Sequence, residues 1–425
     1  MLYSLPYVPQ EYNGYPTSGY RQSGSAANAV YGSANSGFEK ARNVRLETSA
    51  KIEYSFPFLK GLKASMFASW DYYDGDGKTF TYAYDIMAFT PADKNNANKG
   101  NGYSLVKSAN LSPEGNMYVG NNKRQKVMLR PSISYNNKIG LHDIGALFLY
   151  EQKKENSSSF SGSRKDFDIF DLPELNFGDA ATAIINGSSG KSAYAGYVGR
   201  LNYAYDNKYL VEASFRYDGS YLFAEGQRWG FFPSVSLGWV ASEDFFKDLF
   251  PKIDYFKLRG SVGILGNDNV DPFLYRKLYE LNSNNVAFGT SPSSQSTLSN
   301  KVAYPMTDLT WEKCRTINLG FEMNAWNGLL GVEFDVFYKY TYDILQNITS
   351  IYPASLGGHV PTRMNDGTFD NKGFELILKH RNQISDFNYS LTGNLTYAHN
   401  RILSKRQADG TLPWQSTLGS SIGDV

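Results

Sequence analysis

Stretches in which apolar and polar residues alternate recur along the whole chain, and the connections between them are short and long in turn. In the clearest stretch, residues 208–218, Tyr209 and Phe215 share one face while Glu212 and Arg216 share the other. This follows because successive side chains of a strand point to opposite sides. About twelve such stretches follow one another, so the pattern predicts an all-β chain of strands with one apolar and one polar face.

The connections decide which kind of β-protein the pattern favours. Tight turns rich in Asn, Asp, Gly and Pro are expected at residues 57–61, 136–140, 206–207, 326–328 and 381–386. Long polar connections alternate with them, near residues 75–124, 155–194, 267–307 and 346–370, with a shorter one at 219–228. The long connections therefore gather at one end, which is typical of a transmembrane antiparallel β-barrel and unusual in a compact soluble domain. One connection at the other end, residues 242–255, is longer and is expected to contain a helical turn.

Aromatic residues are abundant, with 32 Tyr and 27 Phe. An amphipathic Tyr ring suits the two interfaces of a membrane, where one end of the side chain is apolar and the other is wet. The candidates for such girdles lie near the ends of the expected strands: Tyr54, Tyr72, Tyr150, Tyr205, Tyr217, Trp239, Tyr340 and Tyr397. The alternative is that these rings belong to the core of a soluble β-protein.

Composition excludes several other classes of protein. No stretch approaches the roughly 20 apolar residues of a membrane-spanning helix. The net charge of +1 gives no basic field of the kind that marks proteins that bind nucleic acid. Cys314 is the only cysteine, which excludes an internal disulfide and a cysteine zinc site.

No motif points to catalysis, so no catalytic, cofactor-binding or metal-binding residue is predicted. Gly190-Lys-Ser192 lacks the first glycine of a phosphate loop and is interpreted as a flexible loop. Asp74-Gly-Asp-Gly-Lys78 and Asp366-Gly-Thr-Phe-Asp370 resemble fragments of calcium loops without the closing glutamate. They are interpreted as surface turns, with a low-affinity calcium site left open. The four histidines are scattered without metal-ligand spacing.

The ends of the chain lead to an expectation about its extent. Met1-Leu-Tyr-Ser-Leu-Pro6 does not have the basic start and apolar stretch of a secretory signal, and Leu418 to Val425 contains no terminal aromatic strand. We expect the chain to be a piece of a longer protein.

Several motifs in order resemble the SusC/RagA family of TonB-linked outer-membrane transporters. They are Arg216-Tyr-Asp-Gly-Ser220, Arg228-Trp-Gly-Phe-Phe-Pro-Ser-Val-Ser-Leu-Gly-Trp239, Lys257-Leu-Arg-Gly-Ser261, Leu309-Thr-Trp-Glu-Lys313 and Asn371-Lys-Gly-Phe-Glu-Leu376. The resemblance covers most of the chain from about Asn43 onward. Tyr221-Leu222 stands where the family has a Ser-Arg pair, and Cys314 stands where a threonine is usual. Both departures fall at loop or strand-edge positions, so they bear on the detail of the loops more than on the resemblance to the family.

The resemblance implies a plugged barrel of about 22 strands, of which this chain supplies about twelve, with the plug domain outside it. Residues 1–42 are then the lead-in from the plug, and residues 43–425 the partial barrel. Lumen-facing charges are expected on the polar strand face: Arg45, Glu47, Lys51, Arg130, Arg200, Glu212, Arg216, Arg259, Glu322 and Glu375.

The function that the resemblance implies is TonB-energised import of oligomeric nutrients, glycan or peptide, across the outer membrane of a Gram-negative bacterium. The implied partners are a SusD-like surface lipoprotein that closes over the barrel mouth, the TonB complex acting through the plug, and outer-membrane lipid. No cofactor is implied. A passive porin-like barrel, a secreted glycan-binding β-sandwich and a barrel enzyme are the alternatives, and the last lacks a catalytic cluster.

Two groups of residues are the site candidates. Aromatic residues of the long connections are expected to contact substrate or lid, or else to pack within their loops: Tyr103, Tyr118, Phe160, Phe167, Phe170, Phe177, Tyr221 and Phe223. Residues of the family motifs are expected to be structural: Arg216, Asp218, Gly219, Ser220, Arg228, Trp229, Pro233, Trp239, Trp311 and Gly373.

Overall fold

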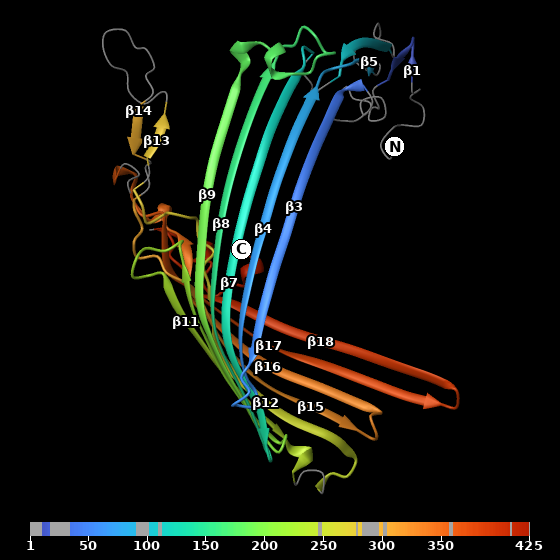
Figure 1. Cartoon of the computed structure of the whole chain (residues 1–425), viewed down its shortest axis with the longest axis vertical. Coiled ribbons are helices and arrows are strands. Elements are labelled where there is room, and N and C mark those ends of the chain that lie inside the picture. Colours follow the sequence, from blue (N-terminus) through green and yellow to red (C-terminus); the bar gives the residue numbers. More distant parts are fainter. Residues whose placement is uncertain are drawn as a thin grey trace. The chain divides into compact units, whose positions relative to one another are not determined.

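The computed structural model is an all-β structure built around one sheet of twelve strands (Figure 1). It describes residues 11–17, 35–90, 102–108, 113–244, 249–277, 279–282, 297–300, 304–356, 360–408 and 410–424. The sheet strands, in chain order, are β3 (Gly37–Ser55), β4 (Leu62–Thr81), β7 (Asn116–Ile139), β8 (His142–Lys165), β9 (Ile184–Tyr205), β10 (Tyr209–Ser220), β11 (Trp229–Val240), β12 (Ile253–Asn267), β15 (Glu312–Ala325), β16 (Leu330–Asn347), β17 (Arg363–Ile384) and β18 (Phe387–Ser404).

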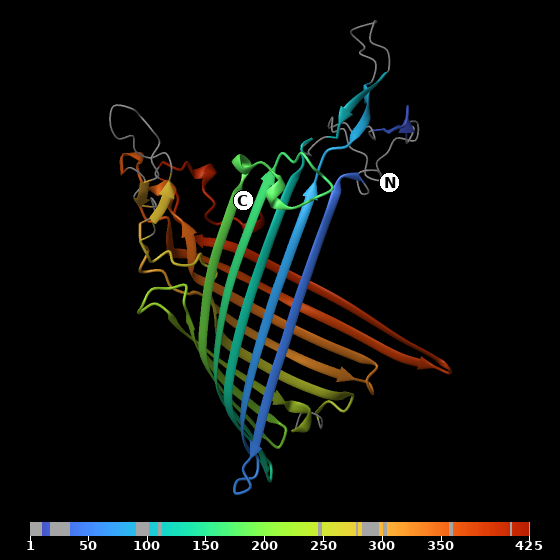
Figure 2. The ribbon, with the colours of Figure 1, turned by 45° about the horizontal axis from the view of Figure 1, so that its top comes forward.

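These strands are neighbours in the sheet in the same order as in the chain, with β3 at one edge and β18 at the other. Every pair from β9 to β18 is antiparallel. Figure 2 shows the short turn that joins β17 to β18. The predicted all-β chain of about twelve antiparallel strands is confirmed.

Smaller elements decorate the connections. Three two-stranded hairpins are β1 (Glu11–Tyr12) with β2 (Tyr15–Pro16), β5 (Asp85–Thr90) with β6 (Gly102–Lys107), and β13 (Tyr279–Asn282) with β14 (Thr297–Asn300). Single 3-10 turns are η1 (Leu175–Phe177), η2 (Ala180–Thr182), η3 (Ala241–Glu243), η4 (Thr349–Ile351), η5 (Ala354–Leu356), η6 (Pro413–Gln415) and η7 (Ile422–Asp424). The helical turn predicted after residue 242 corresponds to η3.

The chain divides into two compact units. One comprises Met1–Ser49, Ser69–Val127 and Lys154–Ser192, and the other comprises Ala50–Ala68, Met128–Lys153 and Ala193–Val425. The predicted lead-in, residues 1–42, is described only at 11–17 and 35–42, and it stays a prediction. Its last described residues already belong to β3, which begins at Gly37.

Tight turns join the strands at one end of the sheet, because their residues accept backbone angles that most residues avoid. Asp206 and Asn207 have φ values of 52° and 54°, which match the two left-handed positions of a type I′ hairpin turn. Next to them, Asp206 accepts a hydrogen bond from Lys208, with the two charged groups 3.1 Å apart, and this raises the pKa of the Lys208 ammonium. Trp326, Asn327 and Gly328 repeat the positive φ values in the turn from β15 to β16.

Several strands continue further into the long connections than the sequence predicted. β4 ends at Thr81 and β7 begins at Asn116, so the connection expected at 75–124 is shorter and holds the β5–β6 hairpin. Likewise β8 ends at Lys165 and β9 begins at Ile184, against an expected loop at 155–194. These extensions are rich in Ser, Asn and Gly, so apolar alternation disappears although the strands still belong to the ladder.

The pairing register separates the two faces of the sheet from β9 to β18. One row of directly opposed residues is apolar: Tyr203, Val211, Leu237, Gly260, Leu319, Val336, Phe374 and Tyr397. Leu319 in this row is 64% exposed. A face that leaves a row of large apolar side chains uncovered across many strands fits lipid as its solvent.

Aromatic rings mark both ends of this apolar face on β10. Tyr205 and Tyr209 stack at the short-turn end, and Tyr217 stacks on Trp229 with ring centroids 4.8 Å apart at the other end. Eight residues separate Tyr209 from Tyr217, which is roughly 26 Å along a strand. This spacing matches the apolar band of a barrel, about 25 Å tall, once the tilt of the strand shortens it somewhat.

Candidate functional site: the polar face and the outer loops

The second face of the sheet is a polar wall. The row next to the apolar one contains Asn202, Glu212, Ser236, Ser261 and Asn318, each opposite the next in the register. Because side chains alternate along each strand, these residues point away from the apolar face. In a barrel this wall is the lumen side.

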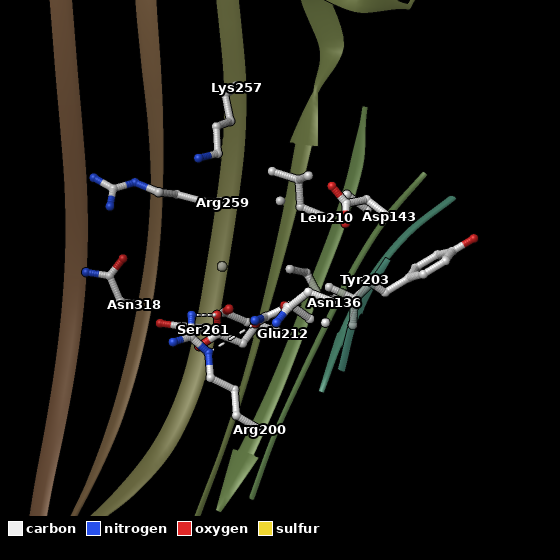
Figure 3. Close-up of a pocket in the computed structure, with 18 residues that line it drawn as sticks. Asn136, Asp143, Arg200, Tyr203, Leu210, Glu212, Lys257, Arg259, Ser261 and Asn318 are labelled. Atoms are coloured by element: carbon white, nitrogen blue, oxygen red, sulfur yellow. Dashed lines mark hydrogen bonds and ion pairs between the residues drawn. The ribbon is translucent and has the colours of Figure 1, made fainter. Parts of the chain in front are cut away.

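A cavity of about 690 Å³ lies against this wall. Its polar lining comes from seven strands and includes Asp143, Arg200, Glu212, Lys257 and Arg259. Figure 3 shows Lys257, Arg259 and Asn318 projecting from adjacent strands on one side, while the ring of Tyr203 points away from them. Arg200 Nη2 donates to Glu212 Oε2 at 2.6 Å across β9 and β10. The cavity therefore offers charges of both signs to any chain segment or ligand that enters the lumen.

Arg259 on β12 contacts acidic side chains on two other strands of the wall. Its Nη2 donates to Asp335 Oδ2 at 2.6 Å, and its Nε lies 3.4 Å from Glu322. Arg259 on β12 is opposite Gly320 on β15, and Gly320 is opposite Asp335 on β16. The guanidinium reaches Asp335 by passing over Gly320. A Cβ atom at position 320 would overlap the Asp335 carboxylate and would lie 2.8 Å from Phe334 O. Asp335 is the more buried partner, with 14% of its side chain exposed.

The register also places the predicted lumen charges Arg200, Glu212, Arg216, Glu322 and Glu375 on the polar face. Many of the predicted lumen charges form ion pairs with neighbours of opposite sign. The pairs are Arg45 with Glu47, Lys51 with Glu53, Arg130 with Glu151, Arg200 with Glu212, and Arg216 with Asp218. Paired charges of mixed sign leave little net field, which does not suit a strong ion filter.

The family-motif residues of the outer loops meet in one cluster. Trp311 packs against Phe223 and Phe232, and its Nε1 donates to the backbone oxygen of Arg228 at 2.9 Å. Arg228 Nε in turn donates to the backbone oxygen of Phe223 at 3.1 Å. These contacts close the connection from β10 to β11 on itself and fasten it to the segment that precedes β15. We call Phe223, Phe232, Met306, Leu309 and Trp311, all buried, the outer-loop cluster.

Two residues that sequence reasoning missed hold further segments to the outer-loop cluster. Asn365 on β17 donates to Thr310 O and accepts from Thr310 N, each at 2.9 Å. Its amide also donates to Asp343 O at 2.7 Å. Met306 packs in the cluster, and its sulfur lies 3.2 Å from the donating amide of Arg363. No local pattern marks either residue, because their hydrogen-bond partners lie 22 to 57 positions away.

The remaining motif residues support strands. Arg216 donates two hydrogen bonds of 2.9 Å to the Asp218 carboxylate. A Cβ at Gly219 would lie 3.0 Å from the ring of Trp229, so the glycine lets that indole lie flat on the strand. The backbone nitrogen of Ser220 donates to Arg228 O at 3.1 Å. Pro233 and Trp239 lie in β11 on its apolar face, opposite Phe215 and Tyr209. At Gly373 a Cβ would meet the ring of Phe337 at 2.8 Å.

The aromatic candidates of the long connections differ in exposure. Phe167, 4% exposed, packs with Phe80 and Met117, and Phe223, 1% exposed, lies in the outer-loop cluster. For these two rings the structure favours loop packing over ligand contact, since their faces are covered. Phe170 stacks on Tyr82, with ring centroids 4.9 Å apart.

The other candidates remain available or undescribed. Phe160 is 60% exposed, and Tyr118 and Phe177 are exposed as well. Tyr221 is half-buried. The side chain of Tyr103 lies outside the described residues.

The interpretation of three motifs as turns or loops is wrong. Asp74 to Lys78 lies inside β4, Gly190 to Ser192 inside β9, and Asp366 to Asp370 inside β17. Asn121 donates to both Asp74 and Asp76, and Arg42 pairs with Asp76, so these carboxylates are used within the sheet. In the part of the chain that the structure describes, no group of three or more His, Cys, Asp or Glu residues is arranged to hold a metal ion.

The fold and its two faces define the class of protein: an antiparallel β-barrel section with a lipid-facing apolar side and a polar lumen side. None of the helices among the described residues is long and apolar enough to cross a membrane. Residues 3–423 match the family described as TonB dependent receptor-like, beta-barrel, and the chain belongs to this family. Its members are outer-membrane receptors of Gram-negative bacteria and not enzymes, which confirms the predicted localisation and the predicted absence of catalysis.

Curated relatives are much longer than this chain. It is 27% identical to the TonB-dependent receptor SusC of Bacteroides thetaiotaomicron over 367 residues, which are 86% of this chain and 33% of the relative. It is 32% identical to the TonB-dependent receptor P39 of Formosa agariphila over 233 residues, 53% of this chain and 21% of that protein. The chain thus spans a fifth to a third of the length of these relatives.

A solved structure shares the fold. The structure of the RagAB peptide importer in the open-open state matches 92% of this chain and 40% of the matched chain, with a TM-score of 0.75 and 20% identity. At this level of identity the likeness supports the fold alone. It agrees with the predicted resemblance to SusC/RagA barrels.

Proposed function

We propose that this chain is the barrel section of an outer-membrane importer that takes up oligomeric nutrients with energy supplied through TonB. The observation that carries the proposal is the polar wall of paired charges in a chain that belongs to the TonB-dependent receptor-like barrel family. A wall of this kind gives a wet lumen in which a plug domain and a polar cargo can both be accommodated. The similarity to SusC supports nutrient uptake as the task.

The proposed partners are a plug domain, the TonB complex and a SusD-like surface lipoprotein. Two outer connections are fastened by buried clusters: the one from β10 to β11 by the outer-loop cluster, and the one from β8 to β9 by Phe167, which packs with Phe80 and Met117. A fastened connection suits repeated docking of a lid, because little conformational entropy is lost each time it closes. Exposed rings on the long connections, such as Phe160 and Phe177, are the proposed contacts with lid or cargo.

Glycan and peptide remain the two proposed cargo classes. RagAB is described as a peptide importer, but at 20% identity that likeness supports the fold alone and does not choose between the two classes. A secreted β-sandwich is disfavoured, because its apolar face would be covered by a second sheet. A passive porin-like barrel is the competing proposal.

Uptake in cells separates energised import from passive passage. A strain that carries the full-length gene should accumulate its oligomeric nutrient only when TonB is functional, and loss of TonB should abolish accumulation. A porin-like barrel would still let the nutrient through after TonB is deleted. Continued uptake of the same nutrient in that deletion strain, at the wild-type rate, would contradict the proposal.

The lid contact is tested by a group of substitutions in the full-length protein. Phe160→Ala, Phe170→Ala and Phe177→Ala together should weaken copurification of the surface lipoprotein or lower nutrient uptake. Phe167→Ala serves as the matched control for loop packing, since that ring is buried. If the triple variant keeps both copurification and uptake at the wild-type level, these rings are not the contact.

A further inference from the structure

An array of aromatic rings joins strand β9 to the connections that follow β10 and β12, at the outer end of the polar face. The ring of Tyr194 is 5.6 Å from that of Tyr221, Tyr221 is 5.9 Å from Phe273, and Phe273 is 6.5 Å from Tyr275, centroid to centroid. All four side chains are half-buried, so each ring keeps part of its surface open. We call these four residues the aromatic array.

The array lies on the lumen side. Tyr194 lies in the middle of β9, opposite Ser220 at the end of β10, and it is in the same strand phase as Arg200, which lines the lumen cavity. Tyr221 follows β10 directly, and Phe273 belongs to the connection that follows β12. A solute that passes from the outer loops into the lumen would therefore meet these rings early.

Cations stand at both ends of the array. Lys153 Nζ lies 5.8 Å from the centroid of the Tyr194 ring, on the polar face of β8. Arg276 lies over Phe273 at 5.2 Å and over Tyr275 at 5.6 Å. Asp271, in the Phe273 connection, is paired with Arg363 at 3.6 Å, which balances its charge.

Phe273 is held in a conformation that a phenylalanine rarely adopts. Its φ is 64°, in the left-handed region, where a residue other than glycine is strained. The neighbouring Leu274 explains how the strain is maintained, because it packs against the outer-loop cluster and its oxygen accepts from Met306 N at 2.9 Å. With Leu274 anchored inward, the Phe273 ring is turned toward Tyr221.

We infer that the aromatic array with Lys153 and Arg276 is a binding site for an acidic carbohydrate chain, an inference that rests on the proposed import function. Neighbouring rings are 5.6 to 6.5 Å apart and their planes are inclined by 56° to 87°, so the open faces of the array point in different directions, and each can take the C–H face of one sugar ring along a turning chain. The two cations fit carboxylate or sulfate groups on the sugars. A peptide has no repeating flat apolar face of this kind.

Binding to the purified full-length protein tests the inference with matched pairs of probes. Oligogalacturonate is compared with its methyl ester, and dextran sulfate oligomers with dextran, by isothermal titration calorimetry. We expect an acidic member of at least one pair to bind about tenfold or more tightly than its neutral partner. Equal binding of both members, or no binding of either acid probe, would overturn the inference, and so would tighter binding of an acidic peptide of equal charge.

The variants assign binding to the array. Phe273→Gly removes the ring at a position whose φ suits glycine, so folding should be preserved, and affinity for the acidic probe should fall about tenfold. Arg276→Gln and Lys153→Gln should weaken the acidic probe and leave the neutral one unchanged. Tyr304→Ala, a 54% exposed tyrosine of the outer loops outside the array, is the control and should bind as wild type. Wild-type affinity in Phe273→Gly would show that the array is not the site.

The two proposals fail separately. If TonB-dependent uptake of a nutrient persists while acidic oligosaccharides do not bind, the array inference is wrong and energised import stands. If acidic oligosaccharides bind at the array but uptake is independent of TonB, the proposed function is wrong.

Discussion

Arginine substitutions at two adjacent residues of β15, one on each face of the sheet, should differ strongly in their effect on folding. Leu319 and Asn318 lie in the middle of this 14-residue strand. Leu319 belongs to the exposed apolar row, and Asn318 lines the lumen cavity. At the middle of a membrane-crossing strand, an outward arginine costs about 2–4 kcal/mol, whereas a lumen arginine remains in water.

The cost translates into a large change in folding. Leu319→Arg should lower the ratio of folded to unfolded protein roughly 30- to 700-fold, since about 1.4 kcal/mol corresponds to a factor of ten. Asn318→Arg should change it little. The assay is urea titration of the full-length protein in lipid vesicles, with the folded fraction read from its mobility in unheated gels. Leu319→Ala controls for the lost leucine itself.

The reasoning is refuted if the two substitutions are equally harmful, or if Asn318→Arg is the worse of the two. Either result would mean that the polar face is not the wet one.

Three further predictions concern single contacts. Trp311→Ala should destabilise the outer-loop cluster by about 3–5 kcal/mol and expose the 219–228 connection to added protease on intact cells. In Trp311→Phe, which keeps most of the packing, the connection should stay resistant to the protease. Gly320→Val should separate Arg259 from Asp335 and lower the urea midpoint of unfolding, because a side chain at position 320 overlaps the Asp335 carboxylate. Unchanged stability would show that the Arg259–Asp335 pair contributes little. Asn207→Val should cost about 1–2 kcal/mol at its left-handed φ and Asn207→Gly almost nothing, a difference that the same urea titration resolves.

The faces, the tight turns and the number of strands could be predicted from the sequence because each depends on local rules. The alternation around Phe215 fixes its face, and Asp206-Asn207 is a turn signal by itself. The predicted ends of β4 and β8 are wrong. Polar residues beyond the apolar band still pair with the neighbouring strands, although apolar and polar residues no longer alternate there. The alternation of apolar and polar residues therefore indicates which part of a strand lies in the membrane, and not where the strand ends.

Contacts between distant segments could not be predicted. Arg259 reaches Asp335 only because Gly320 stands between them in the register, and the register is a property of three strands together. Phe223 looked like an exposed loop aromatic, yet Trp311 covers it from 88 positions further along the chain. The aromatic array could not be predicted for the same reason, since Tyr194 belongs to β9 and Phe273 to the connection that follows β12.

The orientation of the sheet in the membrane tests the account most directly. Cys314 is first replaced by serine, and single cysteines are then placed at Glu225, in the outer connection from β10 to β11, or at Asp386, in the tight turn from β17 to β18. A thiol reagent that cannot cross the outer membrane should label Glu225→Cys on intact cells, and Asp386→Cys only after the membrane is permeabilised. Labelling of Asp386→Cys on intact cells, with Glu225→Cys protected, would contradict the account.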